Sequence, residues 1–277
     1  MAIVMKKTAV ITGAGGVLCA EFARALAADG YRVALLDIRP QATEEVAKSI
    51  RDAGGEAKAY AADVLDQESL RTAVEAVDTS FGPCDLLING AGGNHPKGTT
   101  SSEVFAMEDL DNPEMRSFFD LNPDDMRFVF DLNFLGAFMT TQAFARSMTG
   151  RGGNIINISS MNALRPLTKI PAYSAAKAAV SNFTQWLAVH FAPCGIRVNA
   201  IAPGFFVTNQ NRAMLFDPDG KPTARTEKIL SQTPMGRFGK PAELCGTLRW
   251  LADDEASGFV TGIVVPVDGG FSAYSGV

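Results

Sequence analysis

Short apolar runs alternate with amphipathic stretches along most of this chain of 277 residues. The first run is KTAVIT at 7–12, and a glycine turn with a helical pattern, GAGGVLCAEFARALAADG, follows it directly. β-Branched runs bounded by glycine indicate buried strands, and strands that alternate with helices at short loop lengths favour a parallel sheet. The pattern predicts an α/β fold, a doubly wound parallel sheet of about seven strands with helices on both faces.

Two long segments interrupt this alternation, near residues 93–122 and 205–238. The first is polar, holds two prolines and has no clear period. It follows a strand end, where folds of this class bind ligands, and loops of this length usually carry function. We expect a single domain over residues 1–277 in which both segments are insertions that face a substrate. A mobile surface loop is the alternative.

Composition argues against several classes of protein. Apolar residues make up 47% and charged residues 20% of the chain, as in a globular protein with a large core. The net charge of −5 argues against a nucleic-acid partner. No apolar run reaches the roughly 18 residues of a membrane span, and the start of the chain does not resemble a signal peptide. Four scattered cysteines and two distant histidines predict reduced thiols, no metal site and a cytoplasmic location.

The glycine-rich turn at residues 12–19 lies between the first strand and the first helix. There, glycines let the backbone approach a pyrophosphate at a helix N-terminus, which favours dinucleotide binding over a purely structural turn. The candidate phosphate-binding residues are Gly13, Gly15, Gly16, Val17 and Leu18. Asp37 ends the second strand, where a carboxylate binds ribose hydroxyls and repels a 2′-phosphate. It favours NAD over NADP, although Arg39 lies nearby; capping of the next helix is the alternative.

Tyr173 and Lys177 are four residues apart, so a helix here places them on one face, one turn from each other. A lysine ammonium stabilises a nearby phenolate, and we therefore expect Lys177 to lower the pKa of Tyr173 toward neutrality. Such a phenol can act as a general acid and base, with Ser160 bound to the reacting oxygen. Taken singly, Tyr173 also suits a core aromatic, and Ser160 a helix cap.

Together the motifs resemble those of the short-chain dehydrogenase/reductase family over nearly the whole chain. They are TGAGG in the first turn, Asp63-Val64, Asn89-Gly90-Ala91-Gly92, Asn133, Ser160, Tyr173, Lys177, and Pro203-Gly204 with Thr208. The resemblance implies a Rossmann-type fold and an NAD(P)-dependent oxidoreductase that acts on a CH–OH group. It also implies a homotetramer that assembles through the helices at 123–149 and 172–192.

The resemblance also assigns a role to each position. Tyr173 exchanges a proton with the substrate, Lys177 lowers its pKa and binds the nicotinamide ribose, and Ser160 steadies the substrate oxygen. Asn133 supports a water chain that carries the proton outward; its alternative role is to satisfy helix backbone. The expected cofactor contacts are Asp63 and Val64 at the adenine, Asn89, Ala91 and Gly92 along the channel, and Pro203, Gly204, Phe206 and Thr208 at the carboxamide.

The chain departs from the family pattern around the first turn. Val17 and Cys19 stand where the family has glycines, and Gly90 replaces the second residue of a common Asn-Asn pair. We expect Gly15 and Gly16 to provide the close backbone approach, and the packing of the helix to adjust around the Cys19 side chain. Cofactor binding is expected to survive, because the motif on the nicotinamide side is intact.

Several segments, among them AGGNHPK, FFVTNQNRAMLF and PVDGGFSAYSGV, resemble the D-mannonate oxidoreductase branch of the family. Members of that branch interconvert D-mannonate and D-fructuronate. The expected partner is a sugar acid, with its carboxylate bound by cations and its hydroxyls by amides. Candidate cations are His95, Lys97, Lys169 and Arg212, and candidate amides are Asn94, Asn162, Asn209 and Asn211. Some of these cations are alternatively solvated loop charges.

Three other functions fit parts of the same pattern. A related sugar-acid or polyol dehydrogenase, such as a gluconate 5-dehydrogenase, would use the same machinery on a similar substrate. A non-catalytic NAD-binding regulator would keep the fold, but the intact set around Tyr173 and Lys177 argues against it. A docking protein that uses the aromatic segment 128–144 is disfavoured, because that segment suits a core and a self-association surface.

Overall fold

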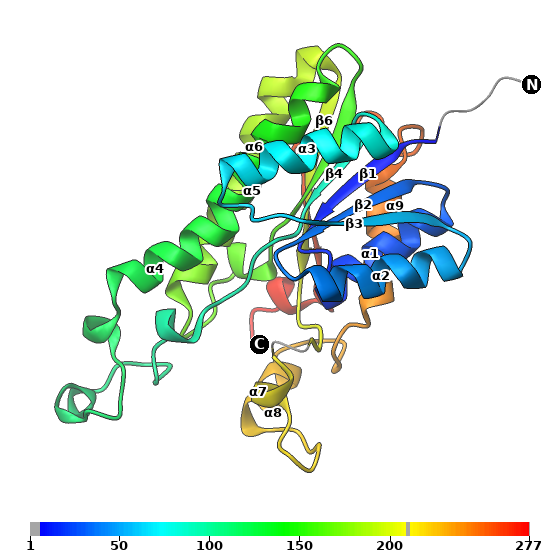
Figure 1. Ribbon diagram of the computed structural model, residues 1–277. Coiled ribbons are helices and arrows are strands. Elements are labelled where there is room, and N and C mark those ends of the chain that lie inside the picture. Colours follow the sequence, from blue (N-terminus) through cyan, green and yellow to red (C-terminus); the bar gives the residue numbers. More distant parts are fainter. Residues whose placement is uncertain (1–5, 209–210, 277) are drawn as a thin grey trace, which may run out of the picture.

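The computed structural model describes residues 6–208 and 211–276, and one parallel sheet forms the centre of these residues (Figure 1). Its strands lie in the order β3-β2-β1-β4-β5-β6-β7. They are β1 (Thr8–Thr12), β2 (Arg32–Asp37), β3 (Glu56–Ala61), β4 (Leu86–Asn89), β5 (Gly153–Ile158), β6 (Ile196–Pro203) and β7 (Val264–Val267). The order runs outward from β1 in both directions, so the sheet is doubly wound and the predicted fold class is confirmed.

Helices cover both faces of this sheet (Figure 1). They are α1 (Val17–Ala28), α2 (Pro40–Asp52), α3 (Gln67–Phe81), α4 (Pro123–Phe130), α5 (Gly136–Ala145), α6 (Pro171–Phe191), α7 (Arg212–Leu215), α8 (Ala224–Ser231) and α9 (Cys245–Ala252). On β1, Ala9 and Ile11 belong to the core under α1, α2 and α9, whereas Val10 belongs to the core under α3, α5 and α6. A strand buried on both faces needs the unbroken apolar run that KTAVIT supplies.

The helices α4 and α5 form one rod, joined by a π-helical turn at Asp131–Leu135. The sequence predicts a regular helix here, so the wider turn is a difference between expectation and structure. A π turn adds a residue to the helical repeat and frequently occurs at functional sites. In this rod it contains Asn133, whose side chain is buried with 1% of the residue exposed.

The two insertions project from the sheet on one side, beyond the carboxyl ends of the strands (Figure 1). The first holds short 3-10 helices at Pro96–Gly98, Met107–Asp111 and Phe118–Asp120, and the second holds α7 and α8. An ion pair between Glu103 and Lys228 joins one insertion to the other. Both stand at the edge where parallel α/β sheets place their ligands.

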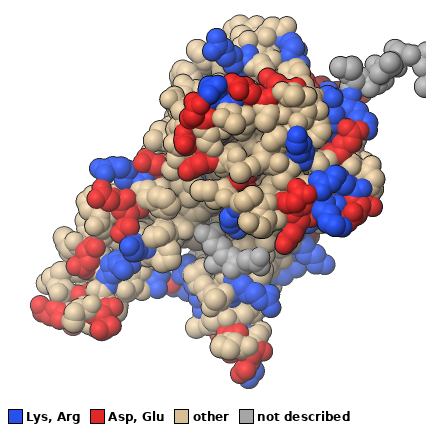
Figure 2. All heavy atoms as spheres, viewed as in Figure 1, with Lys and Arg blue, Asp and Glu red and all other residues tan. Residues whose placement is uncertain are grey.

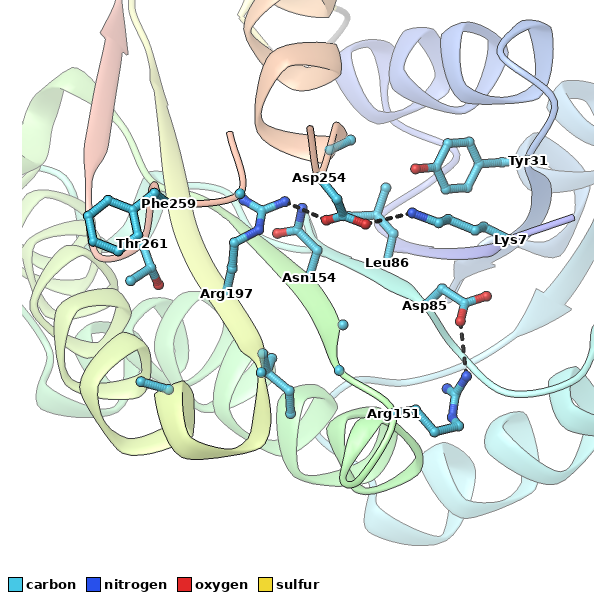
Figure 3. Close-up of a pocket in the computed structure, with 17 residues that line it drawn as sticks. Lys7, Tyr31, Asp85, Leu86, Arg151, Asn154, Arg197, Asp254, Phe259 and Thr261 are labelled. Carbon is cyan, nitrogen blue, oxygen red and sulfur yellow. Dashed lines mark hydrogen bonds and ion pairs between the residues drawn. The ribbon is translucent and has the colours of Figure 1, made fainter. Parts of the chain in front are cut away.

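A cavity of about 660 Å³ opens at the opposite, amino-terminal edge of the sheet (Figure 3). Its charged side chains pair with one another. The Asp254 carboxylate lies 2.6 Å from Lys7 Nζ and 2.8 Å from Arg197 Nη2, and the Asp85 carboxylate lies 3.1 Å from Arg151 Nη1. The paired residues lie just before β1, β4 and β5, at the start of β6, and after α9. The cavity is therefore separate from the edge that carries the predicted chemistry.

Charged residues of both signs are interspersed over the face shown in Figure 2, with acidic side chains gathered at the outer end of the first insertion. No helix within residues 6–208 and 211–276 is long and apolar enough to cross a membrane. Within the same residues, no group of three or more His, Cys, Asp or Glu side chains is arranged to hold a metal ion.

Candidate active site

The turns that follow β1 and β4 are held together by hydrogen bonds to the Thr12 side chain and by the close approach of Gly13 to Ala91. The Oγ1 of Thr12 accepts hydrogen bonds from the N–H groups of Gly90 at 3.0 Å and Ala91 at 3.1 Å. Gly13 adopts a positive φ of 67°, and a Cβ there would lie 2.9 Å from the nitrogen of Ala91. Glycine is therefore required at position 13 both for its backbone angle and for the close approach of the second turn.

Helix α1 begins immediately after the first of these turns. Gly16 is its N-cap residue, and no side chain in the described part of the chain caps the first N–H groups of the helix. These N–H groups and the positive end of the helix dipole form a site suited to a phosphate. The predicted phosphate-binding residues Gly13, Gly15 and Gly16 lie in this turn, and Val17 and Leu18 are the first two residues of the helix.

Asp37 ends β2 beside this turn and is 6% exposed. Its carboxylate accepts a hydrogen bond from the N–H of Gly15 at 3.0 Å. It also accepts bonds from the Arg39 backbone N–H at 3.0 Å and from the Arg39 guanidinium at 3.1 and 3.2 Å. Asp37 therefore faces the glycine turn and orders Arg39, but the alternative of a helix cap is wrong, because Arg39 is the N-cap residue of α2 and no side-chain cap bond is present there.

Tyr173 and Lys177 lie one turn apart near the start of α6, which Pro171 begins at its first position. The Nζ of Lys177 lies 5.7 Å from the centre of the Tyr173 ring and donates to the backbone oxygen of Ile158 at 2.7 Å. Lys177 is only 4% exposed, and burial lowers its pKa to about 8. A lysine with this pKa keeps its charge at neutral pH.

Burial raises the pKa of Tyr173, and a hydrogen bond with Ser160 opposes that rise. The predicted direction, a pKa lowered by Lys177, is wrong: the loss of hydration of the phenolate outweighs the hydrogen bond with Ser160. Ser160 also caps the short 3-10 helix Met161–Ala163, since its Oγ accepts the N–H of Asn162 at 3.2 Å. Ser160 therefore both caps this short helix and contacts Tyr173.

Asn133 connects the π turn to the loop after β4. Its Nδ2 donates to the backbone oxygens of Gly93 and Val129, both at 2.8 Å, and its Oδ1 accepts the Gly93 N–H at 3.1 Å. A Cβ on Gly92 would lie 2.5 Å from Asn133 Oδ1 and 3.3 Å from Lys177 Nζ. Asn133, Gly92 and Lys177 therefore meet at one point, although they come from distant parts of the chain.

Residues 7–217, which include all of these positions, match the profile of the short chain dehydrogenase family. This chain is a short-chain dehydrogenase. Membership makes it an oxidoreductase that acts on CH–OH groups with NAD(P).

Relatives of known sequence or structure support the same assignment. An uncharacterized oxidoreductase of Haemophilus influenzae is 59% identical over 272 residues, which cover 98% of the dehydrogenase and 95% of the relative. A Haemophilus structure with bound NAD, provisionally named D-mannonate oxidoreductase, is 57% identical with a TM-score of 0.95, and the match covers 99% and 98% of the two chains. A gluconate 5-dehydrogenase of Burkholderia cenocepacia, solved with NADP and tartrate, is 32% identical with a TM-score of 0.82. The match covers 97% of this chain and 96% of that structure.

Two further predicted cofactor contacts of the dehydrogenase have other partners. The Nδ2 of Asn89 donates to Thr141 Oγ1 at 2.9 Å and to Asn157 Oδ1 at 2.8 Å, so its side chain points between the sheet and α5. The Oδ1 of Asp63 accepts the N–H of Leu65 at 2.9 Å and orders the loop after β3. Val64 beside it is buried.

The predicted nicotinamide-side residues lie at the end of β6, which is Pro203, and in the loop after it, which contains Gly204, Phe206 and Thr208. Gly204 donates to the oxygen of Val267 at 2.9 Å, and Phe206 is buried at 4% exposure. The Asn211 side chain accepts the N–H of Thr208 and donates to the oxygen of Phe206, both at 2.8 Å. Asn211 therefore braces this loop, and its amide is already engaged where the sequence predicts a substrate contact.

Among the predicted substrate residues, His95 and Lys97 lie in the first insertion. His95 Nδ1 accepts the N–H of Lys97 at 3.3 Å, and the His95 ring meets Phe128 edge-on at 5.5 Å. The histidine thus orders its own loop, while Lys97 is exposed. Asn94 Nδ2 donates to Thr99 Oγ1 at 3.0 Å in the same loop.

Asn162 and Lys169 flank the reaction centre in the segment before α6. Asn162 is 5% exposed, and its Oδ1 is buried without a hydrogen-bond partner among the described residues. Lys169 has a positive φ of 75°, a conformation that strains a residue with a side chain. The N–H of Thr100 donates to the Lys169 oxygen at 2.9 Å and ties this segment to the first insertion.

Arg212 and Asn209 belong to the second insertion. The guanidinium of Arg212 lies 5.7 Å from the centre of the Phe216 ring, a cation–π contact on the exposed side of α7. Asn209 lies outside the described residues.

Three charged residues that the sequence reasoning missed meet between the insertions. Lys228 on α8 is hydrogen-bonded to Glu103, and Arg225 and Lys169 add further positive charge. Together these cations lower the pKa of the Glu103 carboxyl. The Arg225 Nε atom is buried and has no hydrogen-bond partner among the described residues. The spacing of Arg225 and Lys228, one helical turn apart, is the sequence signal that identifies them.

Proposed function

We propose that this dehydrogenase transfers a hydride between NAD(H) and a sugar acid, D-fructuronate in one direction and D-mannonate in the other. The meeting of Ser160, Tyr173, Lys177 and Asn133 beside the glycine turn is the observation that carries the reaction class. The similarity to the Haemophilus structure provisionally named D-mannonate oxidoreductase supports the substrate.

The residues present fit a dinucleotide. The uncapped start of α1 suits the pyrophosphate, and the buried Asp37 carboxylate suits the adenosine ribose hydroxyls. Lys177 would hold the nicotinamide ribose, and Asp63 and Val64 the adenine. Ala91 and Gly92 would line the channel, with the Asn89 side chain behind them between the sheet and α5, and Pro203, Gly204, Phe206 and Thr208 would lie at the carboxamide. The nicotinamide, when bound, supplies or accepts the hydride.

The protein's own contribution is proton transfer at the Tyr173 hydroxyl. Because burial raises the pKa of Tyr173, the phenol is protonated at neutral pH and ready to donate to a substrate carbonyl oxygen. Ser160, hydrogen-bonded to Tyr173, steadies that oxygen. The Lys177 ammonium stabilises the phenolate left behind, and Asn133 orders the loop through which water returns the proton.

The cations between the insertions suit the substrate's carboxylate. Lys169, Arg225 and Lys228 already stabilise one carboxylate, that of Glu103. We assign Lys169 and Arg225 to the acid group of the sugar, with Lys97 and Arg212 at the rim, and Asn162 to a hydroxyl through its unpartnered Oδ1. Arg225→Gln should raise the KM for D-fructuronate about tenfold and leave NADH binding unchanged, whereas Lys221→Gln in the same insertion should change neither.

The deciding experiment measures NADH oxidation with D-fructuronate beside 5-ketogluconate and simple ketones. We expect kcat/KM to be higher for D-fructuronate than for the other ketones. Activity on another ketone with none on D-fructuronate would rule out the mannonate assignment.

Preference for 5-ketogluconate would favour the second candidate, a gluconate 5-dehydrogenase, which the Burkholderia structure supports. Binding of NADH without turnover of any ketone would favour a non-catalytic regulator. Repeating the assay with NADPH tests the role given to Asp37.

We further propose that the dehydrogenase is a homotetramer that associates through the α4–α5 rod and α6. An aromatic row runs across these helices: Phe183 lies 5.6 Å from Phe134 and stacks at 6.2 Å on Trp186, which stacks at 4.5 Å on His190. Trp186 is 56% exposed and Val189 is 78% exposed. An apolar surface of this kind is covered most simply by the same surface of a second copy.

A further inference from the structure

Cys19 and Gly90, two of the positions where this chain departs from the usual family pattern, lie against each other. Cys19 is the third residue of α1 and is 5% exposed, and Gly90 follows β4 directly. A Cβ built on Gly90 would lie 2.2 Å from Cys19 Sγ and 2.8 Å from the oxygen of Thr12. Atoms in van der Waals contact lie roughly 3.5–4 Å apart. The thiol therefore occupies the space that a side chain at position 90 would need.

The sulfur atom makes the shorter of the two close contacts. The third-nearest atom to that added Cβ is Ile158 Cγ1 at 3.7 Å, so the Cβ of Cys19 lies no closer than this. An alanine at position 19 would remove the 2.2 Å contact. The 2.8 Å approach to the Thr12 oxygen would remain, and because this is a backbone atom, the turn would still have to shift to relieve it.

This contact lies between the two turns that form the cofactor site. Thr12 Oγ1 binds the N–H groups of Gly90 and Ala91, and Gly13 packs on Ala91. The turns therefore have little freedom to move apart. A displacement at Gly90 is passed to Ala91 and then to the loop that Asn133 holds.

The Cys19 thiol has no chemical role of its own at this position. Burial raises its pKa to about 12, so it remains protonated at neutral pH and is a poor nucleophile and metal ligand. Its contribution is steric.

We propose that Cys19 and Gly90 are a matched pair that sets the position of the start of α1 against the turn after β4. Cys19 is thus a positioning residue for the dinucleotide. The inference rests on dinucleotide binding by this site and is independent of the sugar-acid assignment.

A double-mutant cycle tests the pair, with Kd for NADH and the unfolding temperature as the two measurements. Gly90→Ala should weaken NADH binding about tenfold and lower the unfolding temperature by about 5 °C. Adding Cys19→Ala should recover part of both losses, so that the two substitutions are clearly less than additive, while the remaining contact with the Thr12 oxygen keeps the recovery incomplete. Adding Cys84→Ala, at a buried cysteine in the core on the other face of the sheet, should restore neither quantity.

The kinetic signature separates positioning from general stability. Cys19→Ala should raise the KM for NADH and leave kcat at saturating NADH within about twofold of the unmodified enzyme. Additive effects of the two substitutions, or normal NADH binding by Gly90→Ala, would overturn the inference. If Gly90→Ala does not fold, a folded double variant supports the pair and an unfolded one refutes it. Failure of the unmodified protein to bind NADH would count against the cofactor assignment, while the unfolding cycle would still decide the pairing.

Discussion

Burial of the charged Lys177 side chain at the reaction centre costs folding free energy. Lys177 is almost completely buried and donates to the Ile158 oxygen, and burial has moved its pKa down to about 8. Tyr173 beside it has a raised pKa. Both groups are therefore protonated at neutral pH, which suits reduction of a carbonyl, and oxidation of the alcohol should be favoured as the pH rises.

Replacing Tyr173 by phenylalanine should separate cofactor binding from turnover. The variant keeps the ring beside Lys177 but lacks the hydroxyl that exchanges the proton. We expect kcat to fall about 1,000-fold while the Kd for NADH changes by less than about threefold. Stopped-flow and fluorescence titration measure the two quantities. Tyr60→Phe, on a strand remote from the reaction centre, is the control, and near-normal turnover in Tyr173→Phe would remove this residue as the proton donor.

The buried lysine should also leave a signature in stability against pH. The folded-state pKa of Lys177 is about 8, below the unfolded value of 10.5, so between these values the unfolded chain binds more protons. The full penalty for burying the charge is present below pH 8 and disappears as the pH rises toward 10.5. Relative to Lys177→Met, the unmodified enzyme should gain about 2 kcal/mol of unfolding free energy between pH 8 and pH 10 in urea titrations. A constant difference between the two proteins would contradict a charged, buried lysine.

At the scale of the element, the sequence predicts those parts whose causes are local. A strand buried on both faces requires a continuous apolar run, and such runs mark β1 and its neighbours directly. The π turn is invisible to this reasoning, because it depends on hydrogen bonds between Asn133 and Gly93, which lie far apart in sequence. The raised pKa of Tyr173 has a similar origin, since burial is a property of the folded surroundings.

The three hydrogen bonds of Asn133 should make the π turn and the loop after β4 a single unit. Asn133→Ala should destabilise the protein by about 2 kcal/mol and speed amide exchange at residues 93–99. Asn122→Ala is a matched control, because this residue only caps the start of α4 with a bond of 2.7 Å to Asp124. The control should lose about 1 kcal/mol with no change in exchange at Gly93. Equal exchange in both variants would show that the two segments move independently.

At the scale of the molecule, the apolar face of the α4–α5 rod and α6 determines the expected assembly. Trp186→Glu places a charge at the centre of the aromatic row, where a partner surface would have to desolvate it. We expect a mass by light scattering below that of the unmodified protein, with Thr72→Glu on α3 as the control for an added charge. A monomeric mass for the unmodified protein, or an unchanged mass for Trp186→Glu, would contradict this interface.

The sequence predicts the location of the candidate site better than its contents. Strand ends and the helix carrying Tyr173 locate the reaction, because their spacing along the chain controls their geometry. The charges between the insertions were missed, since Glu103 and Lys228 are brought together only by loops that have no repeating pattern. Asn211 shows the same limit: an amide side chain suits a substrate contact, whereas in the structure this amide is hydrogen-bonded to Phe206 and Thr208.

The contact between Cys19 and Gly90 has a consequence for the history of such sequences. Replacement of the glycine first meets a sulfur atom at 2.2 Å, whereas loss of the thiol first leaves only a small void. Substitution of Gly90 is therefore more costly as a first step than loss of the Cys19 thiol. A family member with a side chain at position 90 is reached from this arrangement more easily when the thiol is lost first. Ancestors along that path should lose the thiol before they gain the side chain.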